Sequence, residues 1–367
     1  MATLSAWRRH AVNGTAHAFI ALIVASLLSG TPVEAFSSGP DEGGGGTTTG
    51  IGGVVYVDVA TARGGDGSSW ANALNRLQDA IDIVDPGDQV WVAAGTYTPT
   101  SWPSGGAPYA RMAHFSLRNR VEVFGGFVGS ETSLVERNPE DNPTVLSGDI
   151  GVVGDITDNC YHVFFHPEGS HLNSSAVLDG FTITLGNANG PGVSGKGGGV
   201  YNFMSSPTLS DVIFVNNLVD EGGGLFNDTA SPALTNCTIG PNMADDGAGM
   251  FNDFFSAPVL TNCVVVENAA AWNGGGVLND YFSAPTFANC QVSRNVAGWN
   301  GGGMFNYNGS APVLTGCTVA DNFAWQGGGM YNYFSTPHLV DSAVVDNRAS
   351  MKGSQMYNMY MRPTVVD

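Results

Sequence analysis

The second half of the chain is a series of short apolar segments separated by glycine, proline and asparagine. The segments are rich in Val, Thr, Phe and Tyr, which favour strands, and they are too short for helices. Glycine triplets and prolines recur between them and would destabilise any α-helix there. The pattern therefore predicts many short β-strands between residues 197 and 367.

These segments repeat with a period of about 26 residues. Each unit reads approximately G-G-G-[MV]-[YF]-N, a short loop, S-x-P-x-L-T-N-C-x-V, and then x-x-N with a turn. One unit cannot bury its apolar side chains alone, whereas stacked units pair every strand with the units above and below. The repeat predicts an all-β fold, a single-stranded parallel β-helix with three strands per coil. The glycine-rich starts are Gly197, Gly222, Gly247, Gly274, Gly301, Gly327 and Gly353.

Asparagine and cysteine each recur at a fixed phase of the repeat. In stacked coils, identical residues lie about 4.8 Å apart, so asparagine side chains can hydrogen-bond to their own copies. Cysteine behaves as a small buried hydrophobe, and same-facing cysteines on successive coils have poor disulfide geometry. We interpret both rows as structural ladders. They consist of Asn202, Asn227, Asn252, Asn279, Asn306 and Asn332, and of Cys237, Cys263, Cys290 and Cys317.

The periodicity is looser between residues 54 and 196. Leu77 to Val84 has helical spacing and ends before the turn Asp85-Pro86-Gly87. Short strands are expected around this helix, and we interpret the region as irregular coils of the same stack. The helix is expected to cap the open N-terminal end, which would otherwise present unpaired strand edges.

The first residues have the features of a signal peptide. Arg8 and Arg9 precede an apolar stretch from Ala18 to Leu28, and Val33-Glu34-Ala35 has the form of a cleavage site. We predict a signal peptide at residues 1–35 and a flexible leader at residues 36–53. No later segment is apolar enough to span a membrane, so a secreted or cell-surface location is expected.

Several motifs in the first half resemble a known superfamily. They are Tyr56-Val57-Asp58, the run from Gly65 to Trp70, LQDAID, and the run from Gly87 to Tyr97. Together they look like the opening of secreted proteins of the pectin-lyase-like right-handed β-helix superfamily. The glycine-rich units resemble the repeats of the polymorphic outer-membrane protein family. The resemblance implies right-handed winding and export. Members of the pectin-lyase-like superfamily include polysaccharide lyases, glycosidases and adhesins.

Charge and composition narrow the range of partners. The chain carries 32 acidic and 13 basic residues, a net charge of −19, so nucleic acid, which requires clustered cations, is a poor partner. Charged residues make up 12% and apolar residues 43%, which argues against disorder. Short carboxylates on turns are also suitable ligands for calcium. The histidines have no zinc-ligand spacing.

One edge of the predicted stack combines tryptophan with carboxylates. The residues just before the glycine triplets place Trp272, Trp299 and Trp325 in one row. Asn273 and Asn300 lie in the neighbouring row, which begins with Lys196. Two earlier coils hold four carboxylates at these phases, Asp220, Glu221, Asp245 and Asp246. We name the three tryptophans the Trp strip, and the four carboxylates with Lys196 the acidic cluster.

Two interpretations of this edge remain open. In the first it is a glycan-binding groove, in which indole faces stack on sugar rings while the carboxylates hold Ca²⁺ or act as acid and base. In the second the tryptophans pack on their own copies and the acids are solvated turn residues. A second aromatic set is either an exposed adhesive face or part of the core; it contains Phe254, Phe255, Tyr281, Phe282, Tyr307, Tyr333 and Phe334.

The leading functional hypothesis is a secreted or cell-surface β-helix protein that binds polysaccharide or another surface ligand. The alternative is a pectate-lyase-like polysaccharide lyase, ahead of a hydrolase, with Asp220, Glu221, Asp245, Asp246 and Lys196 as its candidate catalytic residues. Of the motifs typical of polygalacturonase-type β-helices only the paired aspartate is present, while G-H-G and R-I-K are absent. A purely structural surface protein is the third possibility. No cofactor is required, and the four carboxylates form the candidate calcium site.

Overall fold

The structure is a computed structural model that describes residues 53–62, 64–100 and 110–366. All of them belong to one compact unit, Gly50–Asp367. The predicted signal peptide at residues 1–35 and the predicted leader at residues 36–53 lie, apart from Gly53, outside the described residues. Within the described ranges, no helix has the length and apolar character needed to cross a membrane.

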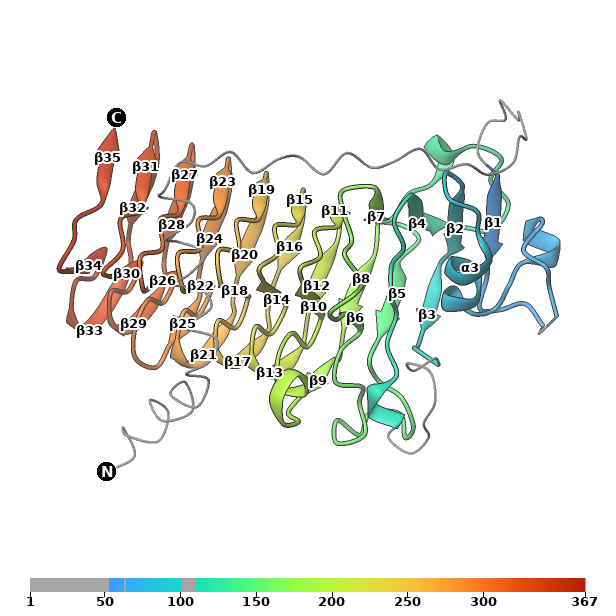
Figure 1. The fold of residues 1–367 in the computed structure, drawn as a ribbon, viewed down its shortest axis with the longest axis horizontal. Coiled ribbons are helices and arrows are strands. Elements are labelled where there is room, and N and C mark those ends of the chain that lie inside the picture. Colours follow the sequence, from blue (N-terminus) through green and yellow to red (C-terminus); the bar gives the residue numbers. More distant parts are fainter. Residues whose placement is uncertain (1–52, 63, 101–109, 367) are drawn as a thin grey trace, which may run out of the picture. The chain divides into compact units, whose positions relative to one another are not determined.

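Four parallel sheets run along a stack of coils, and each strand pairs with the strand one coil earlier and one coil later (Figure 1). Sheet A has 11 strands and sheet B has 9. Sheet A contains β1 (Val54–Val57), β2 (Gln89–Ala93), β4 (Val121–Phe127), β7 (Ala176–Asp179), β11 (Thr208–Ser210), β15 (Ala233–Thr235), β19 (Val259–Thr261), β23 (Thr286–Ala288), β27 (Val313–Thr315), β31 (His338–Val340) and β35 (Thr364–Val366). Sheet B contains β3 (Gly95–Tyr97), β5 (Thr144–Ser147), β8 (Thr182–Thr184), β12 (Ile213–Val215), β16 (Thr238–Ile239), β20 (Val264–Val266), β24 (Gln291–Ser293), β28 (Thr318–Ala320) and β32 (Ala343–Val345).

The other two sheets begin later in the chain, with 8 strands in sheet C and 7 in sheet D. Sheet C contains β6 (Phe164–His166), β10 (Val200–Phe203), β14 (Leu225–Asp228), β18 (Met250–Asp253), β22 (Val277–Asn279), β26 (Met304–Asn306), β30 (Met330–Tyr333) and β34 (Met356–Met359). Sheet D contains β9 (Asn187–Ala188), β13 (Leu218–Glu221), β17 (Met243–Asp246), β21 (Ala269–Asn273), β25 (Val296–Ala297), β29 (Phe323–Gln326) and β33 (Arg348–Lys352).

The regular coils therefore have four strands, and the prediction of three per coil was wrong. The segment T-N-C-x-V contributes to two strands, such as β15 and β16. In the structure its asparagine adopts a left-handed conformation, with φ 54° at Asn236 and at Asn262 and 53° at Asn289. Asparagine tolerates this conformation better than other non-glycine residues. The turn it makes divides each segment into one strand of sheet A and one of sheet B.

The predicted helix is present as α3 (Leu77–Ile83) and lies over β1 and β2 at the N-terminal end of the stack (Figure 1). Its buried residues include Leu77, Ala80 and Ile81. The guanidinium of Arg118 donates to the carbonyls of Ile81, Asp82 and Val84 at the end of the helix. It therefore satisfies carbonyl groups that have no partner within a helix.

Buried asparagines hold the regular coils together from inside. In the first ladder each side-chain N–H group donates to the oxygen of the next copy, from Asn202 to Asn227 at 3.0 Å through Asn332 to Asn358 at 2.7 Å. The second ladder runs from Asn217 to Asn347 at the other end of the coil. Each copy therefore both donates and accepts, which removes the cost of burying an amide.

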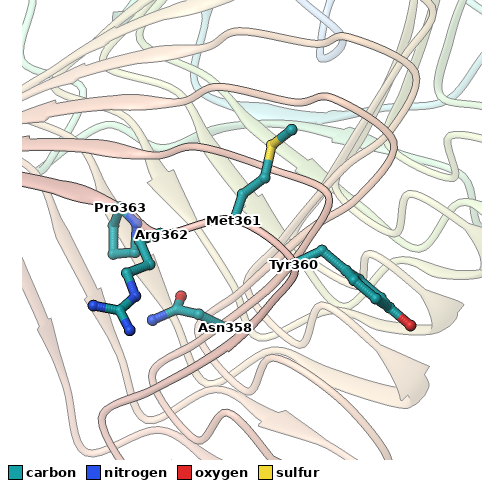
Figure 2. Close-up of a pocket in the computed structure, with 5 residues that line it drawn as sticks. All are labelled: Asn358, Tyr360, Met361, Arg362 and Pro363. Carbon is teal, nitrogen blue, oxygen red and sulfur yellow. The ribbon is translucent and has the colours of Figure 1, made fainter.

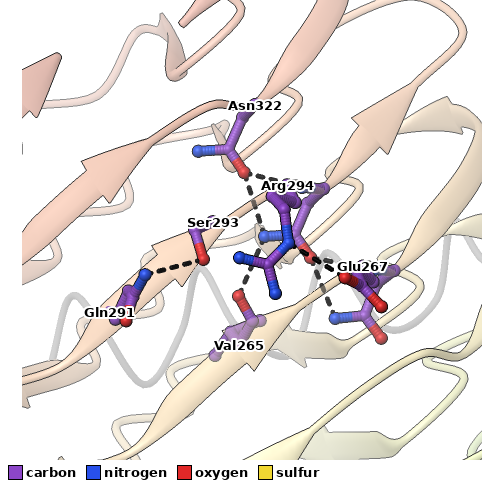
Figure 3. A network of polar contacts seen from close by, with 8 residues as sticks. Val265, Glu267, Gln291, Ser293, Arg294 and Asn322 are labelled. Atoms are coloured by element: carbon purple, nitrogen blue, oxygen red, sulfur yellow. Dashed lines mark hydrogen bonds and ion pairs between the residues drawn. The ribbon is translucent and has the colours of Figure 1, made fainter. Parts of the chain in front are cut away.

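Figure 3 shows one rung of the second ladder, with Val265 and Asn322 labelled. Asn295 donates to Oδ1 of Asn322 through its main-chain N–H at 2.9 Å and through its side chain at 3.0 Å. The same side-chain nitrogen donates to the carbonyl of Val265 at 3.0 Å. The side chain therefore joins three successive coils.

The cysteine row lies beside these ladders in the core. Cys160, Cys237, Cys263, Cys290 and Cys317 are all buried and free. The main-chain N–H of Cys263 donates to the sulfur of Cys290 at 3.4 Å, and that of Cys290 donates to the sulfur of Cys317 at the same distance. The neighbouring Cys263 sulfur is the main cause that raises the pKa of Cys290 to about 11. The buried thiol therefore stays protonated at neutral pH.

Candidate functional site

The Trp strip lies on the outside of sheet D. The exposed fractions of Trp272, Trp299 and Trp325 are 41%, 45% and 50%. Main-chain hydrogen bonds join their positions, from the Trp299 N–H to the Trp272 carbonyl and from the Gln326 N–H to the Trp299 carbonyl, both at 2.8 Å. The strip therefore follows the stacking direction.

The first two indoles of the strip are displaced by bulges. Ala244 pairs with Ala270, and Asp246 pairs with Asn273, so β21 has one more residue than β17 between these pairs. The extra residue changes the local twist and alters the direction of a side chain. The rings of Trp272 and Trp299 meet edge to face, with centroids 5.3 Å apart and planes at 74°. Part of each indole therefore packs on its neighbour, and much of its surface remains exposed.

A row of amides runs beside the strip. The side chain of Asn300 donates to Oδ1 of Asn273 at 2.8 Å, and Asn273 donates to Oδ1 of Asp246 at 2.9 Å. The main-chain N–H of Asn273 donates to the same Asp246 oxygen at 3.0 Å. The chain of hydrogen bonds therefore starts at a carboxylate of the acidic cluster and continues next to the indoles.

The four carboxylate side chains of the acidic cluster point in two different directions. Glu221 pairs with Asp246 in register, and both are partly buried, whereas Asp220 and Asp245 are exposed. Successive residues of a strand point to opposite sides, which separates the two pairs. Among the described residues, no group of three or more His, Cys, Asp or Glu side chains is arranged to hold a metal ion. Calcium binding by the four carboxylates stays a prediction.

Lys196 compensates part of the negative charge. Its Nζ lies 3.0 Å from Oε2 of Glu221 and 4.4 Å from the ring centroid of Phe226. Burial lowers the pKa of Lys196, but the charges of Glu221, Asp253 and Asp228 together outweigh burial and raise it. Lys196 is therefore a cation at neutral pH, and its ammonium group has no lone pair with which to accept a proton.

Asp246, unlike Lys196, has a pKa close to neutral pH. Burial, the largest cause, raises its pKa to about 6, although the hydrogen bonds from Asn273 lower it. The charges of Glu221 and Asp245 raise it further. A carboxyl group that titrates near neutral pH can exchange protons with a bound molecule.

A third set of carboxylates was missed in the sequence. Asp228, Asp253 and Asp280 each follow an asparagine of the first ladder, and Asp228 pairs with Asp253 in register. Asp253 and Asp280 are 7% and 5% exposed. Burial and then the charge of Asp280 raise the pKa of Asp253 well above its usual value. The dipeptide Asn-Asp in three successive repeats was the available signal.

The second aromatic set lies at the turn that leads from sheet C to sheet A. Phe255, Phe282 and Phe334 are exposed by 47%, 58% and 41%, so these three rings are not core residues. Phe255 and Phe282 stack with centroids 5.5 Å apart. Both have positive φ angles, 59° and 61°. Bulky residues rarely adopt this conformation, because the side chain then crowds the main chain.

A hollow of about 630 Å³ lies on the last described coil (Figure 2). It is lined by Asn358, Tyr360, Met361, Arg362 and Pro363. It contains no residue of the Trp strip or of the acidic cluster. The candidate site is therefore a strip along the side of the coils and not this hollow.

Residues 156–324 match the family model described as "Right handed beta helix region". The fold is a right-handed parallel β-helix. The structure is similar to pectate lyase Pel9A, with a TM-score of 0.47 and 13% identity over 86% of this chain and 77% of that chain. It is also similar to the A-module of a mannuronan C-5 epimerase, AlgE4, from Azotobacter vinelandii, with a TM-score of 0.33 and 14% identity over 85% of this chain and 100% of that chain. The sequence matches no curated protein.

Proposed function

We propose that this protein is an extracellular or cell-surface β-helix that binds polysaccharide along the Trp strip. The observation that carries the proposal is the exposure of three indoles in line on successive coils, at 41%, 45% and 50%. An exposed indole presents an apolar face that matches the C–H face of a sugar ring. The predicted signal peptide at residues 1–35 supports the location.

The amide row supplies the polar half of the proposed contact. Asn273 and Asn300 lie next to the indoles, and a carboxamide both donates and accepts hydrogen bonds. Sugar hydroxyls need both functions. Because neighbouring coils repeat the same pair of groups, successive sugar units of a polymer would meet similar surroundings. A repetitive ligand therefore suits this surface better than a single small molecule.

The negative charge of the chain favours neutral polysaccharides over acidic ones as ligands. The net charge is −19, and the exposed carboxylates of Asp245 and Asp220 lie one and two coils, respectively, before Trp272. Like charges repel, more strongly at low ionic strength. We therefore propose a neutral polysaccharide as the ligand and expect polyuronates to bind less well.

The test is binding of the full mature chain to a panel of neutral and acidic polysaccharides, measured by affinity gel electrophoresis and calorimetry. The triple variant Trp272→Ala, Trp299→Ala, Trp325→Ala is expected to weaken binding by about 100-fold, because large aromatic anchors usually dominate such contacts. Unchanged binding by this variant would refute the proposal.

The chain provides a matched control at another corner of the coil. The triple variant Phe255→Ala, Phe282→Ala, Phe334→Ala removes three aromatic side chains of similar exposure. It is expected to bind like the unaltered protein. Equal losses in the two triple variants would show that any exposed ring contributes, and would contradict a site on the Trp strip.

A polysaccharide lyase or hydrolase is the second candidate, and the pKa of Asp246, raised to about 6, favours it. In this case Asp246 acts as the proton donor, and Lys196 forms an ion pair with Glu221. Incubation with uronic-acid polymers, with and without Ca²⁺, detects a lyase through the absorbance of its unsaturated product. Hydrolysis releases reducing ends from neutral polymers. Asp246→Asn is expected to abolish either activity while leaving binding intact.

A further inference from the structure

The connection between β5 and β6, residues 148–163 (Figure 1), and the strand β9 together carry an unusual set of buried oxygens. Oδ1 of Asp158, Oδ1 of Asn159 and Oδ1 of Asn187 are all buried, and no donor among the described residues reaches them. Asn159 is 3% exposed and Asn187 2%. Buried acceptors without a partner are rare, because each has lost its contact with water.

Hydrogen bonds bring the three residues into one small region. Asp158 and Asn159 are neighbours in the chain. Nδ2 of Asn187 donates to the carbonyl of Ile156 at 2.6 Å, and the main-chain N–H of Asn187 donates to the carbonyl of Cys160 at 2.8 Å. Asn187 therefore bridges two points of the segment that carries the other two oxygens.

The loop holds the Asp158 carboxylate by one oxygen and leaves the other without a donor. Oδ2 accepts the main-chain N–H of Val152 at 2.8 Å. Gly151 has a φ of 76°, and a Cβ placed there would lie 2.5 Å from the same Oδ2. Glycine at this position therefore allows the loop to fold closely over the carboxylate. The arrangement fixes the Asp158 carboxylate, whose Oδ1 is buried.

The nearest cation does not satisfy the three oxygens. Arg111 donates to the main-chain carbonyls of Asn159 and Asn187, each at 2.7 Å, and to Oδ1 of Asn189 at 2.8 Å. Its bonds connect the loop to β9 from the main-chain side. Against this single positive charge, the loop itself carries three carboxylates, Asp149, Asp155 and Asp158. The local charge therefore favours a further cation.

We propose that Asp158, Asn159 and Asn187 form a calcium site that ties the β5–β6 connection to the first strand of sheet D. One water molecule has only two O–H groups for three acceptors, whereas a cation attracts oxygen acceptors without having to donate a hydrogen bond. Calcium prefers carboxylate, amide and main-chain oxygens and accepts irregular geometry. The site is separate from the acidic cluster, and its role is to order an irregular coil.

The experiment uses the mature chain stripped with EDTA, with calcium added back. We expect calcium to raise the melting temperature by about 3–6 °C at saturation. Terbium, which replaces calcium, is expected to show luminescence excited through nearby aromatic rings, and calcium should displace it. Magnesium at the same concentration is expected to give no comparable shift, because it demands six ligands in strict geometry.

Three variants locate the site. Asp158→Asn is expected to weaken calcium binding by about tenfold or more, because it removes the only charged ligand of the three. Its melting temperature in EDTA should match that of the unaltered protein, which shows that it folds. Asp85→Asn, at an exposed turn outside both carboxylate groups, is the control and should leave calcium binding unchanged. Asp245→Asn tests the acidic cluster separately.

Two results would overturn the proposal. One is an unaltered protein whose melting temperature and terbium signal do not respond to calcium. The other is calcium binding that persists in Asp158→Asn and is lost in Asp245→Asn, which would place the ion in the acidic cluster. Neither outcome bears on polysaccharide binding, so the two proposals fail independently.

Discussion

Buried asparagines of the regular coils and of the irregular coils have different partners. Asn252, in a regular coil, accepts from Asn227 and donates to Asn279. Asn187, in an irregular coil, donates to the carbonyl of Ile156, but its side-chain oxygen has no donor among the described residues. Repetition supplies each copy with a partner of the right kind, because the neighbour one coil away is identical. Where the repeat is interrupted, another group has to take that place.

The largest expected effect comes from interrupting the first ladder. Asn252→Leu removes two hydrogen bonds and leaves Asn227 with an unpaired donor and Asn279 with an unpaired acceptor. We expect the free energy of unfolding to fall by about 3–5 kcal/mol, measured by urea denaturation in EDTA.

The matched change in the irregular coils is Asn187→Leu. It removes one side-chain hydrogen bond and leaves only the carbonyl of Ile156 without that donor. We expect a loss of about 1–2 kcal/mol in EDTA, clearly smaller than that of Asn252→Leu. Equal losses for the two variants would mean that the repeat gives no special advantage to buried amides.

Replacing Asp246, the carboxylate in the row of amides, should have an intermediate effect on the free energy of unfolding, and this effect should depend on pH. Because the pKa of Asp246 is raised to about 6 in the folded protein, the folded state holds its proton more firmly than the unfolded state between about pH 4 and pH 6. The unfolding free energy contributed by this group is therefore full below that window and decreases as the pH rises through it. Asp246→Asn keeps an acceptor for Asn273 and removes the titration.

We expect Asp246→Asn to be more stable than the unaltered protein by about 1–2 kcal/mol at pH 7 and equally stable at pH 4. Urea denaturation at the two pH values, compared between the two proteins, isolates this group from the other carboxylates. A stability difference that is the same at both pH values would show that the carboxyl is not titrating in this range.

The smallest effect on the free energy of unfolding is expected from breaking an ion pair at the surface. Arg294 and Glu267 form an ion pair at 2.9 Å between adjacent coils, with side chains 56% and 52% exposed (Figure 3). Arg294→Ala should change the unfolding free energy by less than about 1 kcal/mol, since solvent screens exposed pairs. A loss as large as that of Asn252→Leu would mean that contacts outside the coil, and not the buried ladders, hold adjacent coils together.

The repeat predicted the fold class because the phase of a residue in a repeat determines its neighbours in a stack. The number of strands per coil could not be predicted as easily, since it depends on the left-handed conformation of Asn236 and its copies, and nothing in the segment T-N-C-x-V distinguishes a bend from a continuous strand. The opposite directions of Asp220 and Glu221 follow from strand alternation. The sequence interpretation placed them in two neighbouring rows but still treated the four carboxylates as one cluster.

Other parts of the candidate site lay beyond sequence analysis. The burial of Asp253 and Asp280 depends on side-chain packing in three dimensions, which a repeat pattern does not contain. Asp158 and Asn159 lie in a connection that occurs once, and Asn187 is hydrogen-bonded to it, so no periodicity marks these residues. Tertiary packing, rather than local pattern, determines both arrangements.

The bulge in β21 adds a residue to a coil without shifting the strand pairs on either side of it. Insertions at this corner are therefore tolerated by the rest of the molecule. A duplicated coil would lengthen the Trp strip by one indole, and a deleted coil would shorten it. Tandem duplication in the gene could thus adjust the length of polymer that is held without redesigning any contact. The number of coils, which sets the length of the binding surface, can therefore change independently of the side chains that make each contact.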